Sequence, residues 1–517
     1  MIITILSFIF ALGIIISIHE LGHLIFAKKA DILCHEYSIG MGPLIFGKRK
    51  KETMISLRAI PIGGYVSMAG EEVNNSLITK DQKIGIKLEN NKIKYIYLDN
   101  LDKADIIGTV EGFDLYNKDE TGLFINLNVD GNIQSYDCLE NAFYKYGKKK
   151  ENEMQIMPYK RCFESKKPFQ KFLTIIMGPM FNFLLALVLY MIVALFSGVP
   201  VEKAIVGKKV EDNYGNVKLM KNDEIIGLTI GNNKYEIETW EDYREHINEF
   251  INSNEENVNL TVLRDNKEIN VSLNPTIVIY NIQIQSYNYN LDEVNVSVIG
   301  TEEFENGVTI TKIIDLKDDI VYNNISWDIL VNEIFSNTDE REFKFHYMDG
   351  NEEKTLTTKT YAKDVLDIKG ITSNAAVSLG ITSKTKFSFT YFITSGFTEI
   401  YDNTKEVFQT LGLLFTGKVS LRDLSGPVGI ASATGKVAHE GFLALLAFTA
   451  FLSVNIGIVN LLPIPALDGG RLLFVLYEAI TKKQPNKKVE NTLITIVFVL
   501  LMVLFVFVTF NDILRLF

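Results

Sequence analysis

The sequence predicts a polytopic α-helical membrane protein with four transmembrane helices and folded polar segments between them. Its 517 residues allow three or four folded units at roughly 150 residues each. Charge is strongly segregated, because several long windows are nearly free of charged residues while others are mostly polar. About 20 apolar residues are enough to cross a bilayer. The candidate spans are residues 2–27, 172–196, about 441–462 and 493–510.

The first span is expected to remain in the protein rather than to act as a signal peptide. No basic residue precedes its apolar run, and an ionisable cluster interrupts it. A secretory signal peptide has a basic start and an apolar centre without such a cluster. Four crossings then put both termini on the same side of the membrane.

The overall composition excludes several classes of protein. The chain has 52 Lys and Arg against 63 Asp and Glu, a net charge of −11, which argues against nucleic-acid binding through a basic surface. Its three cysteines, Cys34, Cys138 and Cys162, form no CxxC pair. Neither a disulfide scaffold nor a cysteine-rich zinc module is supported, and we expect three free thiols.

Basic residues near the span ends predict the orientation, because cytoplasmic loops carry an excess of Lys and Arg. We expect a multi-pass protein of the inner (plasma) membrane, with the 28–171 and 464–492 loops in the cytoplasm. Both termini and the 198–440 segment, whose flanks carry few positive charges, are then extracytoplasmic. The basic residues are Lys28, Lys29, Lys48, Arg49, Lys50, Lys51, Lys166, Lys167, Lys171, Arg471, Lys482, Lys483, Lys487 and Lys488.

A repeat within residues 198–440 becomes visible when Trp240 and Trp327 are aligned. Each copy is predicted to contain an amphipathic helix, a strand, a tight turn and a second strand. The turns are expected at Asp265-Asn266 and at Asp349-Gly350. The two copies therefore indicate two α+β units of similar construction.

This arrangement resembles tandem PDZ domains, which hold an extended peptide by adding it to the edge of a sheet. We expect the first PDZ-like copy at 199–277 and the second at 278–365, followed by a linker and amphipathic helix at 366–440. Asn222 stands where PDZ domains commonly have a glycine before Asp223, and no glycine-rich carboxylate loop is visible. Binding of a free C-terminus is therefore not favoured.

Two further segments have a predicted structure but no predicted chemistry. Residues 74–165 contain short alternating runs, KIKYIYL and GLFINLNV, which predict a small β-rich cytoplasmic insertion. This insertion could recruit a cytoplasmic partner. A stretch near 391–415 has apolar residues at helical spacing, and two interpretations stay open: a helix on the membrane surface or a packed amphipathic helix.

The first span contains the sequence His19-Glu20-Leu21-Gly22-His23, an HExxH motif. Two histidines four residues apart lie on one face of a helix and can bind the same metal ion. Glu20 is suited to hold a metal-bound water molecule. In a soluble helix the motif is weak evidence, but within a span each ionisable side chain costs on the order of 2.5–3.5 kcal/mol and needs a partner.

A catalytic zinc ion takes a third protein ligand and keeps one position for water. The sequence NLLPIPALDGGR at 460–471 offers Asp468, where prolines prevent a continuous helix and glycines follow the carboxylate. Asp468 is thus a candidate ligand. Capping of a helix that begins near Gly470 is an equally good interpretation of this residue.

Several separated motifs resemble the site-2 protease family, the bacterial, PDZ-containing intramembrane zinc metalloproteases of peptidase family M50. The resemblance covers the spans and about 200 residues. The motifs appear in the family's order. They are HELGH at 19–23, SIGMGPLIFG at 38–47, SLRAIPIGGYVSMAGE at 56–71, MGPMFNF at 177–183, LSGPVGI from Leu424, and NLLPIPALDGGR ending at Arg471.

The resemblance implies a zinc cofactor held by His19, His23 and Asp468, with Glu20 as the general base. It also implies that Asn182 and Asn460 are polar residues near the site that help to position the substrate. In the family the segment that corresponds to 28–73 contains a membrane-dipping β-hairpin. The residues Gly63, Gly64 and Tyr65 are then expected to help position an opened substrate strand, the two glycines by allowing a turn or close backbone approach.

The implied reaction is hydrolysis of peptide bonds in or near the membrane span of a single-span protein, such as an anti-sigma factor or a remnant signal peptide. In the family, extracytoplasmic PDZ domains are thought to exclude substrates that an earlier cut has not shortened, which makes the enzyme a second-step protease in regulated intramembrane proteolysis. Its implied partners are such substrates and the lipid bilayer.

Two alternatives are a non-catalytic PDZ scaffold with a structural zinc site and a metal transporter. The scaffold gives Glu20 no purpose, because two histidines and an acid suffice for structural binding. A transporter needs polar residues in several spans, and the second and fourth spans offer almost none.

Overall fold

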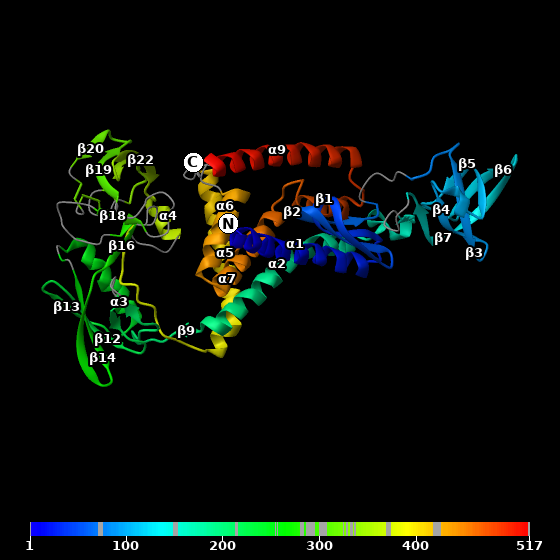
Figure 1. Ribbon diagram of the computed structural model, residues 1–517. Coiled ribbons are helices and arrows are strands. Elements are labelled where there is room, and N and C mark those ends of the chain that lie inside the picture. The colour runs from blue at the N-terminus through cyan, green and yellow to red at the C-terminus, as the bar shows by residue number, and fades with distance from the viewer. Residues whose placement is uncertain are drawn as a thin grey trace. The chain divides into compact units, whose positions relative to one another are not determined.

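The computed structural model describes residues 2–514 except for a series of short stretches. The described chain divides into two compact units. The first unit comprises Met1–Phe196 and Phe392–Phe517, and the second comprises Ser197–Tyr391 (Figure 1). The excepted stretches are 71–75, 148–152, 212–215, 254, 256, 280–283, 286–294, 299–307, 324, 327–328, 331–333, 335–337, 369–373 and 417–424.

Within these described residues, four helices are long and apolar enough to cross a membrane. This confirms the four predicted spans, and each helix extends beyond or stays close to its expected range. The helix α2 begins at Pro168, because proline is favoured in the first helical turn. The four are α1 (Ile2–Lys29), α2 (Pro168–Ser197), α7 (Phe442–Leu461) and α9 (Lys487–Leu514).

The spans pack closely where small residues meet. A Cβ atom added at Gly22 of α1 would lie 2.2 Å from the carbonyl oxygen of Met177 in α2, so the two backbones touch. Helices α2 and α7 share an apolar cluster that includes Ala186, Ala450 and Ile458. By contrast, most of the α9 side chains are exposed in the protein alone, as expected for a helix surrounded by lipid.

Three more helices of the first unit accompany these spans. The helix α5 (Phe389–Phe415) packs against α2, where Asn403 donates a hydrogen bond to the Tyr190 hydroxyl. This contact favours the packed-helix interpretation of the 391–415 stretch. The helix α6 (Pro427–Glu440) begins against Asp512 of α9, whose carboxylate accepts the Gly429 N–H at 2.8 Å. The helix α8 (Asp468–Thr481) follows the proline-containing loop after α7.

Two long strands, β1 (Cys34–Lys50) and β2 (Thr53–Met68), follow α1 and form an antiparallel pair. The chain reverses at Lys51, which has a φ of 57°. Ser38 has Cα partners at both Ser56 and Tyr65, so the pair folds into a curved sheet rather than a simple hairpin. Strand β2 includes Gly63 and Gly64, the two glycines expected to allow a turn or a close backbone approach.

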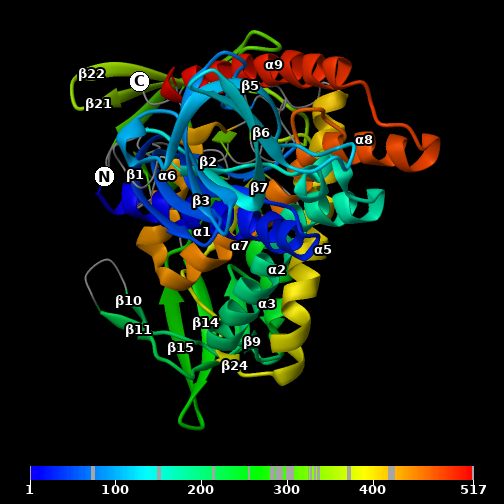
Figure 2. The same cartoon turned by 90° about the vertical axis from the view of Figure 1, so that its right-hand side faces the viewer.

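The insertion is a β-sheet that closes on itself, which agrees with the expected β-rich segment. Strand β3 pairs with β4 and β5, β6 pairs with β5 and β7, and a parallel pairing of β4 with β7 completes a five-stranded ring (Figures 1 and 2). Isoleucines such as Ile84, Ile93 and Ile125 fill its core. The strands are β3 (Lys83–Glu89), β4 (Lys92–Tyr97), β5 (Ile106–Asp114), β6 (Phe124–Val129), β7 (Asn132–Lys145) and β8 (Glu153–Gln155).

Short 3-10 turns connect parts of the first unit. The turn η1 spans Leu101–Lys103 within the insertion. The turns η2 (Tyr159–Arg161) and η3 (Phe163–Ser165) lie between the insertion and α2.

The second unit contains two copies of one strand topology, as the aligned tryptophans predict. In the first copy the strand order is β13-β12-β14-β15, and in the second β20-β19-β21-β22 is the corresponding order. The helix expected around Trp327 lies outside the described residues for the most part. The strands are β12 (Glu224–Ile230), β13 (Asn233–Glu236), β14 (Val258–Arg264) and β15 (Lys267–Leu273), and β19 (Val308–Asp315), β20 (Ile320–Asn323), β21 (Glu342–Asp349) and β22 (Glu352–Lys359).

The turns and the helix of the first copy follow from local sequence. Asp265 and Asn266 have φ values of 49° and 61° and form the two-residue turn between β14 and β15, as predicted. In the second copy Asp349 pairs with Glu352, so the turn lies one residue later than predicted. The helix α3 (Trp240–Ile247) begins with a capping box formed by Thr239 and Asp242.

Short elements complete the second unit, whose two copies share one hydrophobic core. They are β9 (Val199–Pro200), β10 (Val210–Glu211), β11 (Val217–Leu219), η4 (Asn248–Asn252), β16 (Thr276–Ile279), β17 (Ile284–Gln285), β18 (Asn295–Val298), α4 (Lys363–Ile368), β23 (Ala375–Ser378) and β24 (Thr385–Lys386).

Candidate metal centre and cavity

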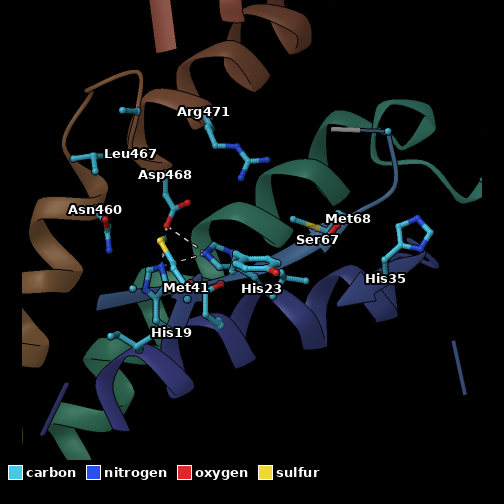
Figure 3. Close-up of a pocket in the computed structure, with 18 of the residues that line it drawn as sticks. His19, His23, His35, Met41, Ser67, Met68, Asn460, Leu467, Asp468 and Arg471 are labelled. Atoms are coloured by element: carbon cyan, nitrogen blue, oxygen red, sulfur yellow. Dashed lines mark hydrogen bonds and ion pairs between the residues drawn. The ribbon is translucent and has the colours of Figure 1, made fainter. Parts of the chain in front are cut away.

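Three side chains predicted from the sequence converge inside the first unit. His19 and His23 lie one helical turn apart on α1, and Asp468 is the first residue of α8 (Figure 3). The two Nε2 atoms are 3.2 Å apart, and the Oδ2 atom of Asp468 lies 3.2 Å from that of His19 and 3.3 Å from that of His23. The three potential ligand atoms thus form a nearly equilateral triangle.

This triangle has the dimensions of one face of a zinc tetrahedron. Zinc binds histidine nitrogen at about 2.0–2.1 Å and carboxylate oxygen at about 2.0–2.2 Å, so two ligand atoms lie about 3.3 Å apart at the tetrahedral angle. The spacing of the three atoms fits that value, and all three residues are buried or nearly so. Two nitrogens and one oxygen leave the fourth position for water, as in a catalytic zinc site.

Helix α2 orients His23 through a backbone contact. The Nδ1 atom of His23 lies 2.8 Å from the carbonyl oxygen of Thr174. A carbonyl only accepts hydrogen bonds, so Nδ1 carries the proton and Nε2 keeps its lone pair for a metal ion. The ring fits there because residue 178 is glycine: a Cβ atom at Gly178 would lie 2.2 Å from Nε2.

Asn182 of α2 lies behind His19 and does not line the cavity. Its amide Nδ2 atom is 3.2 Å from Nδ1 of His19, and its backbone carbonyl accepts the Ser453 hydroxyl hydrogen at 2.8 Å. In the orientation that turns the amide oxygen toward His19, Nδ1 donates and Nε2 is again free to bind a metal ion. The same contact then fixes the tautomer of His19.

The position of Asp468 depends on two glycines that follow it. A Cβ atom at Gly469 would lie 2.2 Å from the carbonyl oxygen of Leu462, and one at Gly470 would lie 2.2 Å from that of Ile464. The start of α8 therefore packs directly on the backbone of the preceding loop. Leu467 is the N-cap residue of α8 and makes no side-chain capping bond, so Asp468 does not cap this helix.

Glu20 lies beside the triad and faces the same cavity. It is buried, and a Cβ atom at Gly64 of β2 would lie 3.0 Å from its Cγ atom. The absence of a side chain at residue 64 thus allows β2 to approach α1 next to Glu20. This is the close backbone approach expected of Gly64, and Gly63 beside it has a φ of 79°, which favours glycine.

The triad opens into a cavity of about 1010 Å³. Every residue from Gly63 to Met68 lines it, although successive side chains of a strand point to opposite faces of the sheet. Six consecutive residues can line one cavity only if the edge of the strand faces it. Met41 and Asn460 also line the cavity. Of the predicted positioning residues, Gly63, Gly64, Tyr65 and Asn460 therefore line it, and Asn182 does not.

A cluster of charged residues surrounds His35 at the far end of this cavity. Arg161 makes a 2.7 Å ion pair with Glu52, which also pairs with Lys28, and the side chain of Arg49 donates to the backbone carbonyl of Glu153. Burial and the nearby Arg49 lower the pKa of His35 to about 4, so its imidazole is neutral at pH 7.

Sequence reasoning missed Thr174, which contacts His23, and Gly178, which leaves room for the His23 ring. It also missed Ser453, which donates to the backbone carbonyl of Asn182. The motif MGPMFNF, with its glycine and proline in an apolar span, is the signal that could have indicated a close helix contact. It also missed Leu77, Met154 and Met157, which line the cavity from the insertion. Nothing in their local sequence distinguishes these three from ordinary core residues.

The chain is similar over its whole length to known proteases. The model of the family described as Peptidase family M50 matches residues 7–504. A zinc metalloprotease RasP from Geobacillus kaustophilus is 32% identical over 519 residues, which covers 99% of this chain and 98% of the relative. Proteins of the same name from Oceanobacillus iheyensis and Bacillus licheniformis are 32% and 30% identical, each with 99% of both chains covered.

Proposed function

Because the chain belongs to peptidase family M50 and is a zinc metalloprotease, we propose that it cuts peptide bonds in or near the membrane spans of single-span proteins. The observation that carries this proposal is the triangle of His19, His23 and Asp468, which has zinc dimensions and draws two of its three members from an apolar span. A metal site at such a position makes hydrolysis at membrane depth possible.

In this proposal His19, His23 and Asp468 hold the zinc cofactor. When bound, zinc supplies a Lewis acid that acidifies a water molecule and polarises the peptide carbonyl group. Glu20 then accepts the proton of that water and donates it to the leaving amine. Its place next to His19, with its carboxylate facing the cavity, suits this role.

The substrate is held in an extended conformation along the edge of β2 from Gly63 to Met68. A transmembrane helix hides its carbonyl groups in internal hydrogen bonds, so it must unwind before it is cut. Strand addition supplies new backbone partners for the unwound segment. The exposed strand edge in the cavity supports this assignment, and Tyr65 and Asn460 flank the same path.

The sheet of β1 and β2 dips into the membrane. Its distal part carries a group of exposed apolar side chains, among them Ile45 and Phe46, which are 65% and 63% exposed. Such a patch on a soluble surface is costly, whereas lipid tails would cover it. The other members are Met41, Leu44, Leu57 and Ile60.

The repeated domains of the second unit are PDZ-like and limit access to the cavity. By the family resemblance they exclude substrates that have not been shortened by a first cut, as in regulated intramembrane proteolysis. Candidate substrates are anti-sigma factors and remnant signal peptides. The distribution of Lys and Arg supports an orientation with both termini and the second unit outside the cell, and with the insertion in the cytoplasm.

Replacement of Glu20 by Gln tests the assignment. The purified variant, reconstituted in liposomes with a single-span model substrate, is expected to lose cleavage by at least a hundredfold while its zinc content stays at one ion per chain. Glu440→Gln, at the exposed end of α6, is the matched control and is expected to keep both. Cleavage by Glu20→Gln at the normal rate would remove Glu20 from the mechanism.

A further inference from the structure

The cavity continues from the metal centre to a second group of residues at the base of the insertion. Leu77 comes from the segment that enters the insertion, and Met154 and Met157 come from the segment that leaves it. Met68 and Gly70, at and after the end of β2, line the same cavity, and Met157 packs against a cluster that contains Ala69, the residue between them. We call these five residues the methionine compartment.

Several contacts join the segment that leaves the insertion to the β1–β2 sheet and the residues that flank it. The N–H of Leu33 donates to the carbonyl of Arg161, and the N–H of Phe163 donates to that of Ala69, at 2.9 and 2.7 Å. The Arg161 side chain pairs with Glu52 at the β1–β2 turn. On the other side of Met157, the backbone carbonyl of Glu153 accepts a hydrogen bond from the Arg49 side chain of β1, so the segment is held both before and after Met157.

The strand edge leads from Glu20 to this compartment. Gly64 packs against Glu20, and Met68 lies four residues further along β2. At about 3.3 Å per residue, these four residues span about 13 Å. A peptide added to the edge with its scissile bond beside Glu20 would bring a residue about four positions away into the methionine compartment.

We propose that the methionine compartment binds one apolar side chain of the substrate, about four residues from the scissile bond. The proposal rests on the proposed proteolytic function and on strand addition along β2. Methionine side chains are flexible and polarisable, so they adapt to aliphatic and aromatic groups of different shape. None of the five side chains is charged, and Lys487, which reaches the Gly70 carbonyl oxygen, already pairs with Glu164. A charged substrate side chain would therefore lose hydration against a mainly apolar wall.

Disulfide exchange between enzyme and substrate tests the contact directly. The enzyme carries Glu20→Gln with either Met154→Cys or Met157→Cys. The probe is a single-span substrate with one thiopyridyl-activated cysteine, placed in turn one to eight residues from the mapped cleavage site on each side. Ile133→Cys on β7, 64% exposed, is the matched surface control, and Met41→Cys in the same cavity reports that the substrate is bound.

Cross-linking to Met154→Cys or Met157→Cys is expected to peak at positions three to five on one side, at least tenfold above Ile133→Cys. Cross-linking at the level of Ile133→Cys, with Met41→Cys reacting normally, would overturn the compartment and leave the protease assignment intact. Absence of cleavage by the unmodified enzyme would instead contradict the proposed function, and the proposed role of the methionine compartment would then be rejected as well.

A change of specificity provides the second test. The unmodified enzyme is expected to cut a substrate with Leu at the peak position at least tenfold more efficiently, in kcat/KM, than one with Lys. Met154→Asp should reverse or abolish this preference by placing a carboxylate beside the lysine. Ile133→Asp should leave the preference unchanged, and an unchanged preference in Met154→Asp would count against the compartment.

Discussion

The imidazole of His23 is held between the carbonyl oxygen of Thr174, 2.8 Å from Nδ1, and the backbone of Gly178, where an added Cβ atom would lie 2.2 Å from Nε2. The first contact selects the tautomer that can bind a metal ion through Nε2. The second requires that residue 178 has no side chain. One turn of α2 therefore determines which nitrogen of His23, a proposed ligand, carries the proton, and it also leaves room for the imidazole ring.

Gly178→Ala is expected to lower zinc content and proteolytic activity at least tenfold, because the new methyl group occupies the position of the His23 ring. Gly412→Ala on α5 is the matched control, since a Cβ atom there meets nothing within 4 Å. Zinc is measured by elemental analysis of the purified variants. Full zinc occupancy in Gly178→Ala would show that the ring can move aside without losing the metal.

Asn182→Asp should retain zinc, whereas Asn182→Leu should weaken zinc binding by about 10–100-fold, the usual cost of removing such a supporting contact. The carboxylate of Asp can still accept the Nδ1 hydrogen of His19, and Leu cannot. Zinc affinity is measured by competition with a chelator. Equal affinities for both variants would contradict the role of Asn182 as an acceptor for His19.

Asp468→Ala is expected to lose most of the bound zinc together with activity, because only two protein ligands remain. Asp402→Ala, an exposed position on α5, should behave like the unmodified protein. Elemental analysis and circular dichroism separate metal loss from unfolding. Normal zinc occupancy in Asp468→Ala would return this residue to a structural role at the start of α8.

The neutral imidazole of His35 should make the protein less stable in acid. Its pKa is about 4 in the folded protein, below the ordinary value of about 6.5, so the unfolded chain binds a proton first. Stability is therefore lost as the pH falls from about 6.5 to 4, by up to about 3 kcal/mol. Arg49 and Glu52 of the β1–β2 turn region, Lys28 of α1 and Arg161 of η2 act on this imidazole.

Thermal unfolding in detergent between pH 4 and 7 measures the effect. His35→Leu is expected to show a flatter pH dependence of Tm than the unmodified protein, because its side chain cannot take up a proton. The exposed His439→Leu is the control and should keep the original pH dependence. Identical curves for all three proteins would exclude His35 as a source of acid sensitivity.

Much of the membrane part could be predicted from the sequence because its signals are local. The apolar runs give the four helices, and the spacing of His19 and His23 puts both on one face of α1. The contact with Asp468 needed more than spacing, since 444 residues separate it from His23, and the motif NLLPIPALDGGR provided the indication. The roles of these residues stay predictions.

The remaining features depend on contacts that no local pattern encodes. The parallel pairing of β4 with β7 closes the sheet of the insertion, but the local sequence of neither strand predicts this pairing. The two glycines of β2 predicted either a turn or a close backbone approach, and only the fold shows that Gly64 packs against Glu20. Met154 and Met157 look like ordinary apolar residues until the fold brings them to the cavity.

The two ends of the polypeptide have to meet before the triangle of His19, His23 and Asp468 exists. Translation supplies Asp468 only after the 444 residues that follow His23 have been made. A nascent chain that has entered the bilayer without α8 therefore lacks one of the three proposed metal ligands. Translation products that end before Asp468 are therefore expected to be inert as hydrolases.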